Sequence, residues 1–195
     1  IINKGAPERL ADVFIQEDFS QRPWTELISD GKQCHFRTSD FCKFSTAKES
    51  NAWFTVLGDS HMASIASGLK DLVADKYNFQ SITAPCYLIR NTDQFFEDKR
   101  LNRHCSAEYQ NTRLELANRG ENSVVVVGGR LPINLTGYYF SYEEHAPPNK
   151  FWRKFVPRAQ GKSVEDEVIA AINVLLLGGN KIVLVYPIPV PGFNV

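Results

Sequence analysis

The feature that most limits how this chain can fold is a regular alternation of buried strands and helices that begins at Trp53. The clearest strand is Ser123–Gly128, in which four valines follow one another without the polar alternation of a half-exposed strand. Such a run is typical of a parallel strand that is buried on both faces of a sheet. Three more strands are predicted, at Trp53–Leu57, Tyr77–Thr83 and Lys181–Tyr186.

Three predicted helices separate these strands. The first begins near Met62, the second covers about residues 107–118, and the third begins at Ser163, which forms the pattern of a capping box with Asp166. Glycines follow the second and third helices, namely Gly120, Gly178 and Gly179. The order of elements predicts an α/β fold, a flavodoxin-like three-layer sandwich around a mostly parallel, doubly wound sheet.

Residues 1–50 differ from residues 51–195 in composition and in the pattern of their apolar residues. They are polar, rich in turn-forming residues, and show no sustained period in their apolar positions. We expect residues 1–50 to form an irregular extension or linker wrapped over a core at residues 51–195. Because the chain starts at Ile1 without an initiator methionine, we expect it to be part of a longer protein.

Composition excludes several classes of function. The chain has 22 basic and 22 acidic residues with no long run of either sign, so no nucleic-acid footprint or polybasic membrane patch is expected. No apolar stretch approaches the roughly 18–20 residues of a membrane span. The 43% of hydrophobic residues is enough to build a core.

The four cysteines allow three disulfide connectivities. The pairing of Cys34 with Cys42 and of Cys86 with Cys105 is favoured, because each pair encloses a polar, loop-like segment that gains from a covalent link. Disulfides imply an oxidising compartment such as a periplasm, whereas the alternative is four free thiols in a cytosolic enzyme. No C-x-x-C pair is present, so neither a zinc site nor any other metal is expected.

The segment Gly58–His61 lies where the first strand gives way to the first helix. This position would expose the Ser60 hydroxyl on a tight turn, next to the free N–H groups of a helix start. A serine placed there can attack a carbonyl, and its own N–H can stabilise the resulting oxyanion. The structural alternative is that Asp59 or Ser60 only caps the helix.

Motifs for other chemistries are missing. The chain has no G-x-G-x-x-G after the first strand, no phosphate-binding G-x-x-x-x-G-K-[ST], and no G-x-S-x-G nucleophile elbow. No cofactor is therefore expected.

Gly58-Asp59-Ser60 after the first strand of such a sheet resembles the SGNH (GDSL-type) hydrolase superfamily. With His61 added, the motif is particularly similar to SGNH domains fused to membrane acyltransferases of family 3, bacterial enzymes that O-acetylate surface polysaccharides. Further segments resemble parts of that subgroup. Ile1–Leu10 is similar to the connection that follows its last membrane helix, and residues 10–50 are similar to the extension before its SGNH core. The other similar segments are Ala84–Tyr87 after the second strand, Val124–Arg130 at the third strand and Tyr186–Pro191 at the end of the fourth.

The resemblance implies an SGNH hydrolase fold in which Ser60 is the nucleophile and an oxyanion N–H donor. It also implies an acyl donor delivered by a fused or associated membrane acyltransferase domain, and a carbohydrate acceptor. The domain would lie on the periplasmic or extracellular face, tethered to the inner membrane.

The chain departs from the SGNH pattern where a Gly after the second strand and an Asn after the third complete the oxyanion hole. These regions here read Thr83–Cys86 and Gly128–Leu131, and Asn134 lies too far on to match. We therefore expect backbone N–H groups near Ser60 and the Arg130 guanidinium to stabilise the developing charge, with Arg130 contacting the oxyanion or the substrate. An ordinary surface or salt-bridging role for Arg130 is the alternative.

A second departure concerns the catalytic base. The family's Asp-x-x-His follows a fifth strand, so the triad Asp and His would lie beyond Val195, or else the domain is catalytically incomplete. None of the histidines present is expected to be the base: His35, His61, His104 and His145.

The sequence therefore favours an extracytoplasmic serine acyltransferase that moves an acyl group, acetyl above all, to a sugar hydroxyl of a surface polysaccharide. One alternative is a stand-alone SGNH carbohydrate esterase. The other is a non-catalytic glycan-binding module, in which the aromatic run Tyr138–Tyr142 would stack on sugar rings.

Overall fold

The structure, a computed structural model, describes residues 27–35, 41–47, 50–96, 98–131, 135, 138–139, 150–151 and 153–185. All of them belong to the compact unit Glu26–Ile188. The predictions for Ile1–Leu10, Asn134, Phe140–Tyr142, His145 and Tyr186–Pro191 fall outside the described residues.

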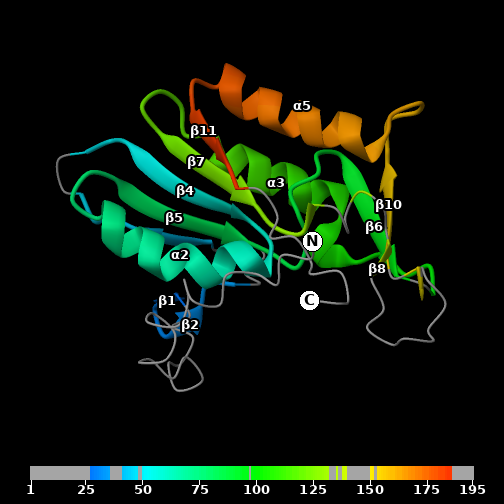
Figure 1. Cartoon of the computed structure of the whole chain (residues 1–195), viewed down its shortest axis with the longest axis horizontal. Helices are drawn as coiled ribbons and strands as arrows, with labels where there is room; N and C mark the ends of the chain where they lie inside the picture. Colours follow the sequence, from blue (N-terminus) through cyan, green and yellow to red (C-terminus); the bar gives the residue numbers. More distant parts are fainter. Residues whose placement is uncertain are drawn as a thin grey trace, which may run out of the picture. The chain divides into compact units, whose positions relative to one another are not determined.

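The centre of the fold is a five-stranded sheet with the order β11-β7-β4-β5-β3 (Figure 1). Its strands are β3 (Cys42–Phe44), β4 (Trp53–Gly58), β5 (Asn78–Thr83), β7 (Val124–Gly128) and β11 (Lys181–Leu184). Only β3 runs antiparallel to its neighbour, so the predicted mostly parallel α/β sheet is confirmed. The four parallel strands are those expected from the sequence, with ends that differ by at most two residues.

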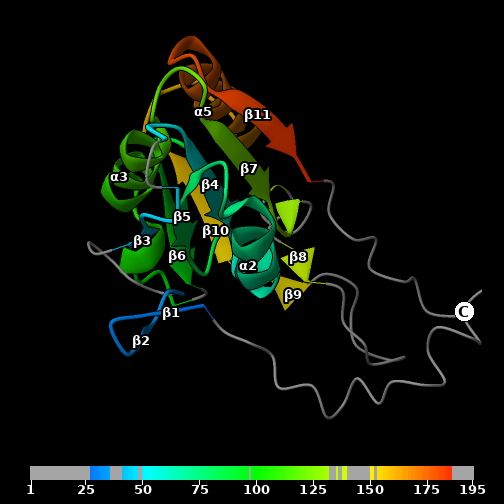
Figure 2. The same ribbon diagram turned by 90° about the vertical axis from the view of Figure 1, so that its left-hand side faces the viewer.

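Three helices of the described part of the chain cover the two faces of this sheet. Helix α2 (Ser60–Val73) packs on one face, while α3 (Ala107–Ala117) and α5 (Val164–Leu177) lie on the other, as Figure 2 shows. Two hydrophobic clusters follow from this arrangement, because alternate residues of each strand point to opposite faces. Val56 and Val126 join the α2 cluster, whereas Leu57 joins the cluster on the α3 and α5 face.

The helix ends test the capping predictions. The Ser163 hydroxyl accepts from the Asp166 N–H at 3.1 Å, and the Asp166 carboxylate accepts from the Ser163 N–H at 2.9 Å, so the predicted capping box is confirmed. Helix α5 ends at Gly178, also as predicted. Helix α3 ends one residue earlier than the predicted residue 118, because Asn118 is its C-cap, and Gly120, with φ of 85°, lies two residues beyond that cap.

No element was predicted between the second strand and the second helix, but this region contains strand β6 (Thr92–Phe96) and a short 3-10 helix at Arg103–Cys105. β6 pairs antiparallel with β10 (Arg153–Pro157), which lies far along the chain. A five-residue strand that begins with three polar residues has no clear local signal, since its pairing depends on a distant partner.

Part of the predicted irregular extension is also ordered. Ile28–Ser29 (β1) and Lys32–Gln33 (β2) form a two-stranded ladder, and β3 completes the edge of the central sheet. A second small ladder joins β8 (Tyr138–Tyr139) to β9 (Lys150–Phe151). The described residues between 27 and 47 thus contribute three short strands, and the boundary of the extension at residue 50 stays a prediction.

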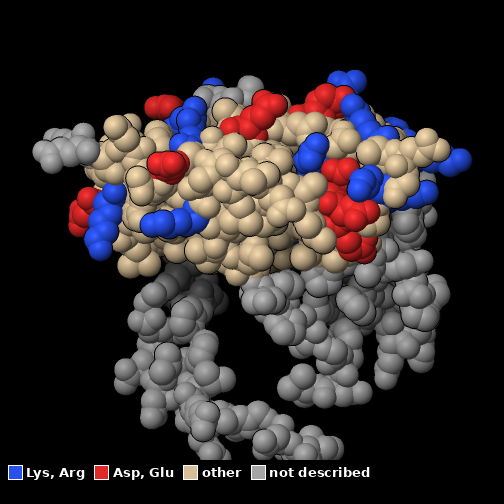
Figure 3. Space-filling model, turned by 90° about the horizontal axis from the view of Figure 1, so that it is seen from above, with Lys and Arg blue, Asp and Glu red and all other residues tan. Residues whose placement is uncertain are grey.

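Neither a membrane-spanning helix nor a metal-binding group is found among the described residues. Every described helix is too short or too polar to cross a bilayer, and no three His, Cys, Asp or Glu side chains of that part gather closely enough to hold an ion. On the face that Figure 3 shows, basic and acidic side chains lie interspersed rather than gathered by sign.

Candidate functional site

Ser60 is the first residue of α2, at the carboxyl end of β4. The end of β4 is flanked by the ends of its two parallel neighbours, since Gly58 is in register with Thr83 of β5 and with Gly128 of β7. The helix thus begins two residues earlier than predicted. The strand-to-helix turn lies at the predicted position, between Gly58 and Ser60. Carboxyl ends of parallel strands are the usual place for a site in open α/β sheets.

Asp59, not Ser60, caps α2. Its carboxylate is 1% exposed and accepts a hydrogen bond from the His61 N–H at 2.9 Å, while its carbonyl accepts from the Met62 N–H at 3.0 Å. Within the described part of the chain, the Ser60 hydroxyl and N–H form no hydrogen bond, and Ser60 is partly exposed. Asp59 therefore performs the capping that was the structural alternative for both residues, and the serine hydroxyl is left for other chemistry.

Two glycines allow this tight turn. A Cβ on Gly58 would lie 2.1 Å from the carbonyl oxygen of Gly128, so any side chain there would force β4 and β7 apart. A Cβ on Gly129, whose φ is 132°, would lie 2.6 Å from the Asp59 carboxyl carbon. The close approach of β7 to the turn thus requires residues without side chains at both positions.

Arg130 follows directly and is held by the same carboxylate. Its N–H donates to Asp59 Oδ2 at 2.6 Å, and its Nε lies 3.7 Å from that oxygen. The guanidinium side chain is 31% exposed. The structure thus places Arg130 beside the turn in an ion pair with Asp59, which is the salt-bridging arrangement. A contact of Arg130 with substrate or oxyanion remains a prediction.

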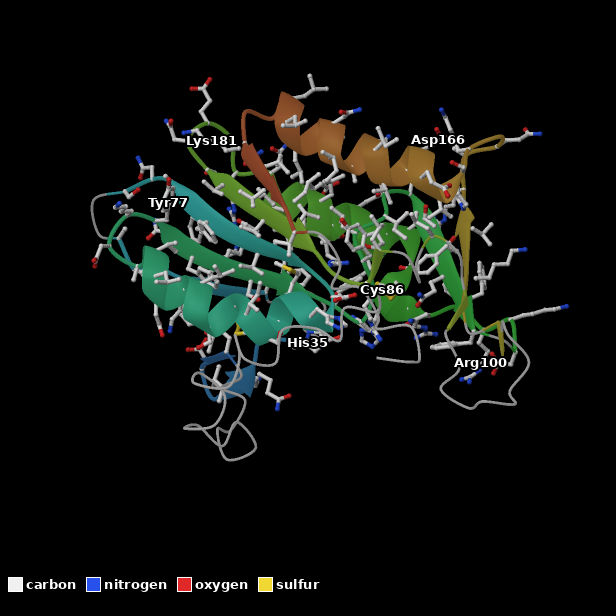
Figure 4. The ribbon with its side chains drawn as sticks, in the orientation of Figure 1. His35, Tyr77, Cys86, Arg100, Asp166 and Lys181 are labelled. Atoms are coloured by element: carbon white, nitrogen blue, oxygen red, sulfur yellow. A yellow bond between two sulfur atoms is a disulfide. The ribbon has the colours of Figure 1, made fainter. Side chains whose placement is uncertain are left out.

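The Asp59 charge also affects the pKa values of neighbouring side chains, among them His35 and Tyr87. Burial lowers the pKa of the His35 imidazole, although the Asp59 carboxylate opposes that shift, and His35 Nδ1 lies 3.2 Å from Thr83 Oγ1. Burial raises the pKa of Tyr87 to about 12, with a further contribution from Asp59. Figure 4 shows His35 at the same end of the sheet as Cys86, whereas Tyr77 and Lys181 lie at the opposite end.

Neither His35 nor Tyr87 was predicted to lie in the site. His35 lies on the segment taken as an irregular extension, where no local pattern indicated that it reaches the sheet. Tyr87 belongs to a segment quoted for the family resemblance, so a signal for it was present.

None of the described histidines bonds to the Ser60 hydroxyl. The Nδ1 of His61 lies 3.3 Å from Asp59 Oδ1, so this ring is turned towards the cap. His104 is exposed and meets the Tyr109 ring edge-on, with ring centroids 6.3 Å apart. That neither histidine is the base stays a prediction.

Both expected disulfides are present, Cys34–Cys42 and Cys86–Cys105, and no cysteine is free. The first links the end of the β1–β2 segment to β3, the edge strand. The second links the loop after β5 to the short helix that precedes α3. Both loops are thereby fastened at sulfur atoms that are buried in the core.

A family model described as "SGNH domain (fused to AT3 domains)" matches residues 28–195. No curated protein matches the chain. Among solved structures, the periplasmic domain of a lipopolysaccharide acetyltransferase of Salmonella ser. Paratyphi A aligns with 14% sequence identity and a TM-score of 0.41. That alignment covers 74% of this chain and 48% of the other, so the chain spans about half the length of this neighbour.

Proposed function

This chain belongs to the family of SGNH domains that are fused to AT3 domains, and on that basis we propose that Ser60 is the nucleophile of an acyl transfer to a carbohydrate. The acyl group, which we take to be acetyl, comes from a fused or associated membrane acyltransferase domain. The acceptor is a sugar hydroxyl of a surface polysaccharide.

The transfer takes place in two steps. Ser60 Oγ forms a bond to the acyl carbonyl carbon, the bond from that carbon to the donor breaks, and the hydroxyl proton passes through a base to the leaving group. In the second step the sugar oxygen attacks the acyl-serine, the bond to Oγ breaks, and the sugar proton returns to Ser60. Both steps pass through an oxyanion, which the Ser60 N–H at the start of α2 would stabilise.

One observation carries this proposal: a partly exposed serine hydroxyl at the end of β4, without a hydrogen bond in the described part of the chain. Asp59 already satisfies the His61 and Met62 N–H groups, so the helix does not need Ser60 as a cap. Such a hydroxyl is a weak nucleophile until a base removes its proton. The family's Asp-x-x-His, which we place beyond Val195, would supply that base.

Two disulfides in one small domain support a location outside the cytoplasm, because reducing compartments keep thiols free. The fusion to AT3 domains named for the family supports a membrane domain as the source of the acyl group. We therefore place the domain on the periplasmic or extracellular face, tethered to the inner membrane.

The test is active-site labelling of the full-length protein with a fluorophosphonate probe. Ser64→Ala is the matched control, because Ser64 lies one turn further along α2 and its hydroxyl donates to the His61 carbonyl at 2.6 Å. We expect wild type and Ser64→Ala to be labelled at Ser60, located by mass spectrometry, and Ser60→Ala to remain unlabelled. Wild-type protein that resists the probe while a control serine esterase reacts would contradict the proposal.

A second measurement separates transfer from hydrolysis. Cells that carry Ser60→Ala should lose O-acetyl groups from their surface polysaccharide, while Ser64→Ala cells keep them. Release of free acetate from an acetylated glycan, with no transfer to an acceptor, would instead identify an esterase. Glycan binding that survives Ser60→Ala, with no turnover by the wild-type protein, would identify a binding module.

A further inference from the structure

Arg113 of α3 is a charged side chain in the middle of the core. It is 0% exposed and is the largest fully buried side chain of the described residues. In that part of the chain no carboxylate lies within ion-pair distance of it. Burial lowers the pKa of Arg113 to about 10, a value at which the guanidinium is still charged at neutral pH. A buried charge without a paired carboxylate is costly, so its hydrogen bonds need an account.

The four terminal N–H groups of Arg113 all face acceptors at the site end of the sheet. Nη2 donates to the carbonyls of Gly58 at 2.7 Å and Ile82 at 3.3 Å. Nη1 donates to the Cys86 carbonyl at 3.2 Å and to Gln110 Oε1 at 2.8 Å. Of the three guanidinium nitrogens of Arg113, Nε alone has no acceptor among the described residues. The guanidinium therefore joins β4, β5 and the loop after β5 at one point.

The Gly58 carbonyl is the acceptor that matters for the site. It belongs to the peptide plane just before Asp59, two residues ahead of Ser60, and it also accepts from the Ala84 N–H at 3.0 Å. Two donors on one carbonyl fix the rotation of that peptide plane. The plane sets the direction in which the chain enters the turn, and hence where the Ser60 hydroxyl points.

Gln110 extends the same network to the disulfide. Its Nε2 donates to the Tyr87 carbonyl at 2.9 Å and lies 3.3 Å from Cys86 Sγ. A buried hydrogen-bond network of this kind makes its surroundings rigid.

We propose that Arg113 is the positioning residue of the nucleophile, holding the Gly58 peptide so that Ser60 is presented in one orientation. This inference rests on the proposed function, since it concerns the same serine. Because Arg113 is buried, it cannot touch substrate, and its effect reaches the reaction only through the turn. Its loss should therefore slow the attack by Ser60 without changing how strongly a ligand binds.

The experiment measures the labelling of Ser60 in the full-length protein over a range of fluorophosphonate concentrations. It yields a maximum rate and a half-saturating concentration for each variant. Arg113→Lys keeps the positive charge but cannot span carbonyls of three segments with one ammonium. We expect it to lower the maximum rate by about 10- to 100-fold, as for other small displacements of a reacting group. The half-saturating concentration should stay within about twofold.

Arg119→Lys is the matched control. Arg119 follows α3 at the opposite end of the sheet, where its Nε donates to Gln80 Oε1 at 3.0 Å and its guanidinium lies 4.8 Å from the Trp53 ring. This variant should lower the melting temperature while the labelling rate of the folded protein stays at the wild-type value. All rates are compared at a temperature where thermal denaturation shows each variant to be folded.

The outcomes are distinct. Wild-type labelling that is lost in Ser60→Ala, together with a slow Arg113→Lys, supports the inference. A folded Arg113→Lys that labels at the wild-type rate overturns it and leaves the proposed function intact. Absence of labelling in the wild type overturns both.

If Arg113→Lys does not fold, Gln110→Leu decides, because it removes one acceptor of Arg113. A reduced maximum rate then supports the inference, and an unchanged rate overturns it.

Discussion

At the scale of single residues, the turn Gly58–His61 divides its tasks among neighbours. Gly58 allows β7 to approach, and Asp59 caps the helix and pairs with Arg130. The Ser60 hydroxyl forms no hydrogen bond to any described residue. A capping motif and a nucleophile motif look alike in sequence, because both need a small polar residue before a helix. The hydrogen bonds of Asp59 distinguish the two.

Substituting Gly58 tests this packing. In Gly58→Ala the new Cβ would meet the Gly128 carbonyl oxygen at 2.1 Å and the Met62 Cγ at 2.5 Å. Backbone cannot give way as a flexible side chain can, so we expect a loss of at least about 2 kcal/mol in the free energy of unfolding. Denaturant-induced unfolding of the purified domain measures it.

Gly68→Ala is the control for that substitution. Gly68 lies within α2 and nothing is found within 4 Å of an added Cβ. Alanine there should raise the free energy of unfolding by about 0.5–1 kcal/mol, because it is the better helix former. Equal effects of the two substitutions would show that β4 and β7 do not approach as described.

At the scale of elements, α3 is an unusual helix because its buried face carries polar residues. Gln110 and Arg113 lie in the core beside Leu114 and Ala117. Those side chains donate hydrogen bonds to carbonyls at the ends of β4 and β5 and in the loop after β5, where the hydrogen bonds between strands stop. A helix that normally only covers a sheet thus also organises the end of the sheet that holds the site.

The disulfides give a prediction at this scale. Replacing both Cys86 and Cys105 with alanine should lower the free energy of unfolding by about 3 kcal/mol, because the unfolded chain regains the freedom of a loop with a sequence separation of 19. The Cys34–Cys42 bridge spans a separation of only 8, so its removal should cost less. Denaturation midpoints of the two double variants measure the difference, and the opposite order would contradict the loop-closure argument.

At the scale of the whole molecule, the pKa shifts of several groups combine. Burial lowers the pKa of His35, so between that value and the ordinary value of about 6.5 the unfolded chain binds more protons than the folded one. Hydrogen bonds from Arg100 and Arg158 lower the pKa values of the exposed Asp98 and Glu108 carboxyls. Both kinds of shift have the same sign, since stability present at neutral pH is lost as the pH falls.

We therefore expect unfolding stability to decline in two stages on acidification, first below about pH 6.5 for the histidine and then in the range where carboxyls titrate. Urea unfolding at a series of pH values measures both stages. His35→Gln keeps a polar group near Thr83 and removes the titration, so the first stage should become shallower. Superimposable pH profiles for the variant and the wild type would rule out His35 as the cause.

Local patterns were sufficient for much of this molecule. Four parallel strands, three helices and the capping box at Ser163 were predicted, because periodicity and capping are properties of neighbouring residues. Both disulfide pairings were predicted from the polar, loop-like segments that they enclose, and the position of Ser60 from its place between a strand and a helix. The family resemblance was confirmed by the match over residues 28–195. The division at residue 50 stays a prediction, although β3 belongs to the sheet.

Contacts between distant parts of the chain decided the rest. The bond from Arg113 to Gly58 joins residues 55 apart, and that from Arg130 to Asp59 joins residues 71 apart. The β6–β10 ladder likewise depends on a partner far along the chain. The sequence does not indicate whether an arginine is exposed to solvent or buried in the core. Only the folded chain shows which carbonyls surround it. The surroundings of the serine are therefore a property of the packed sheet and helix α3 together.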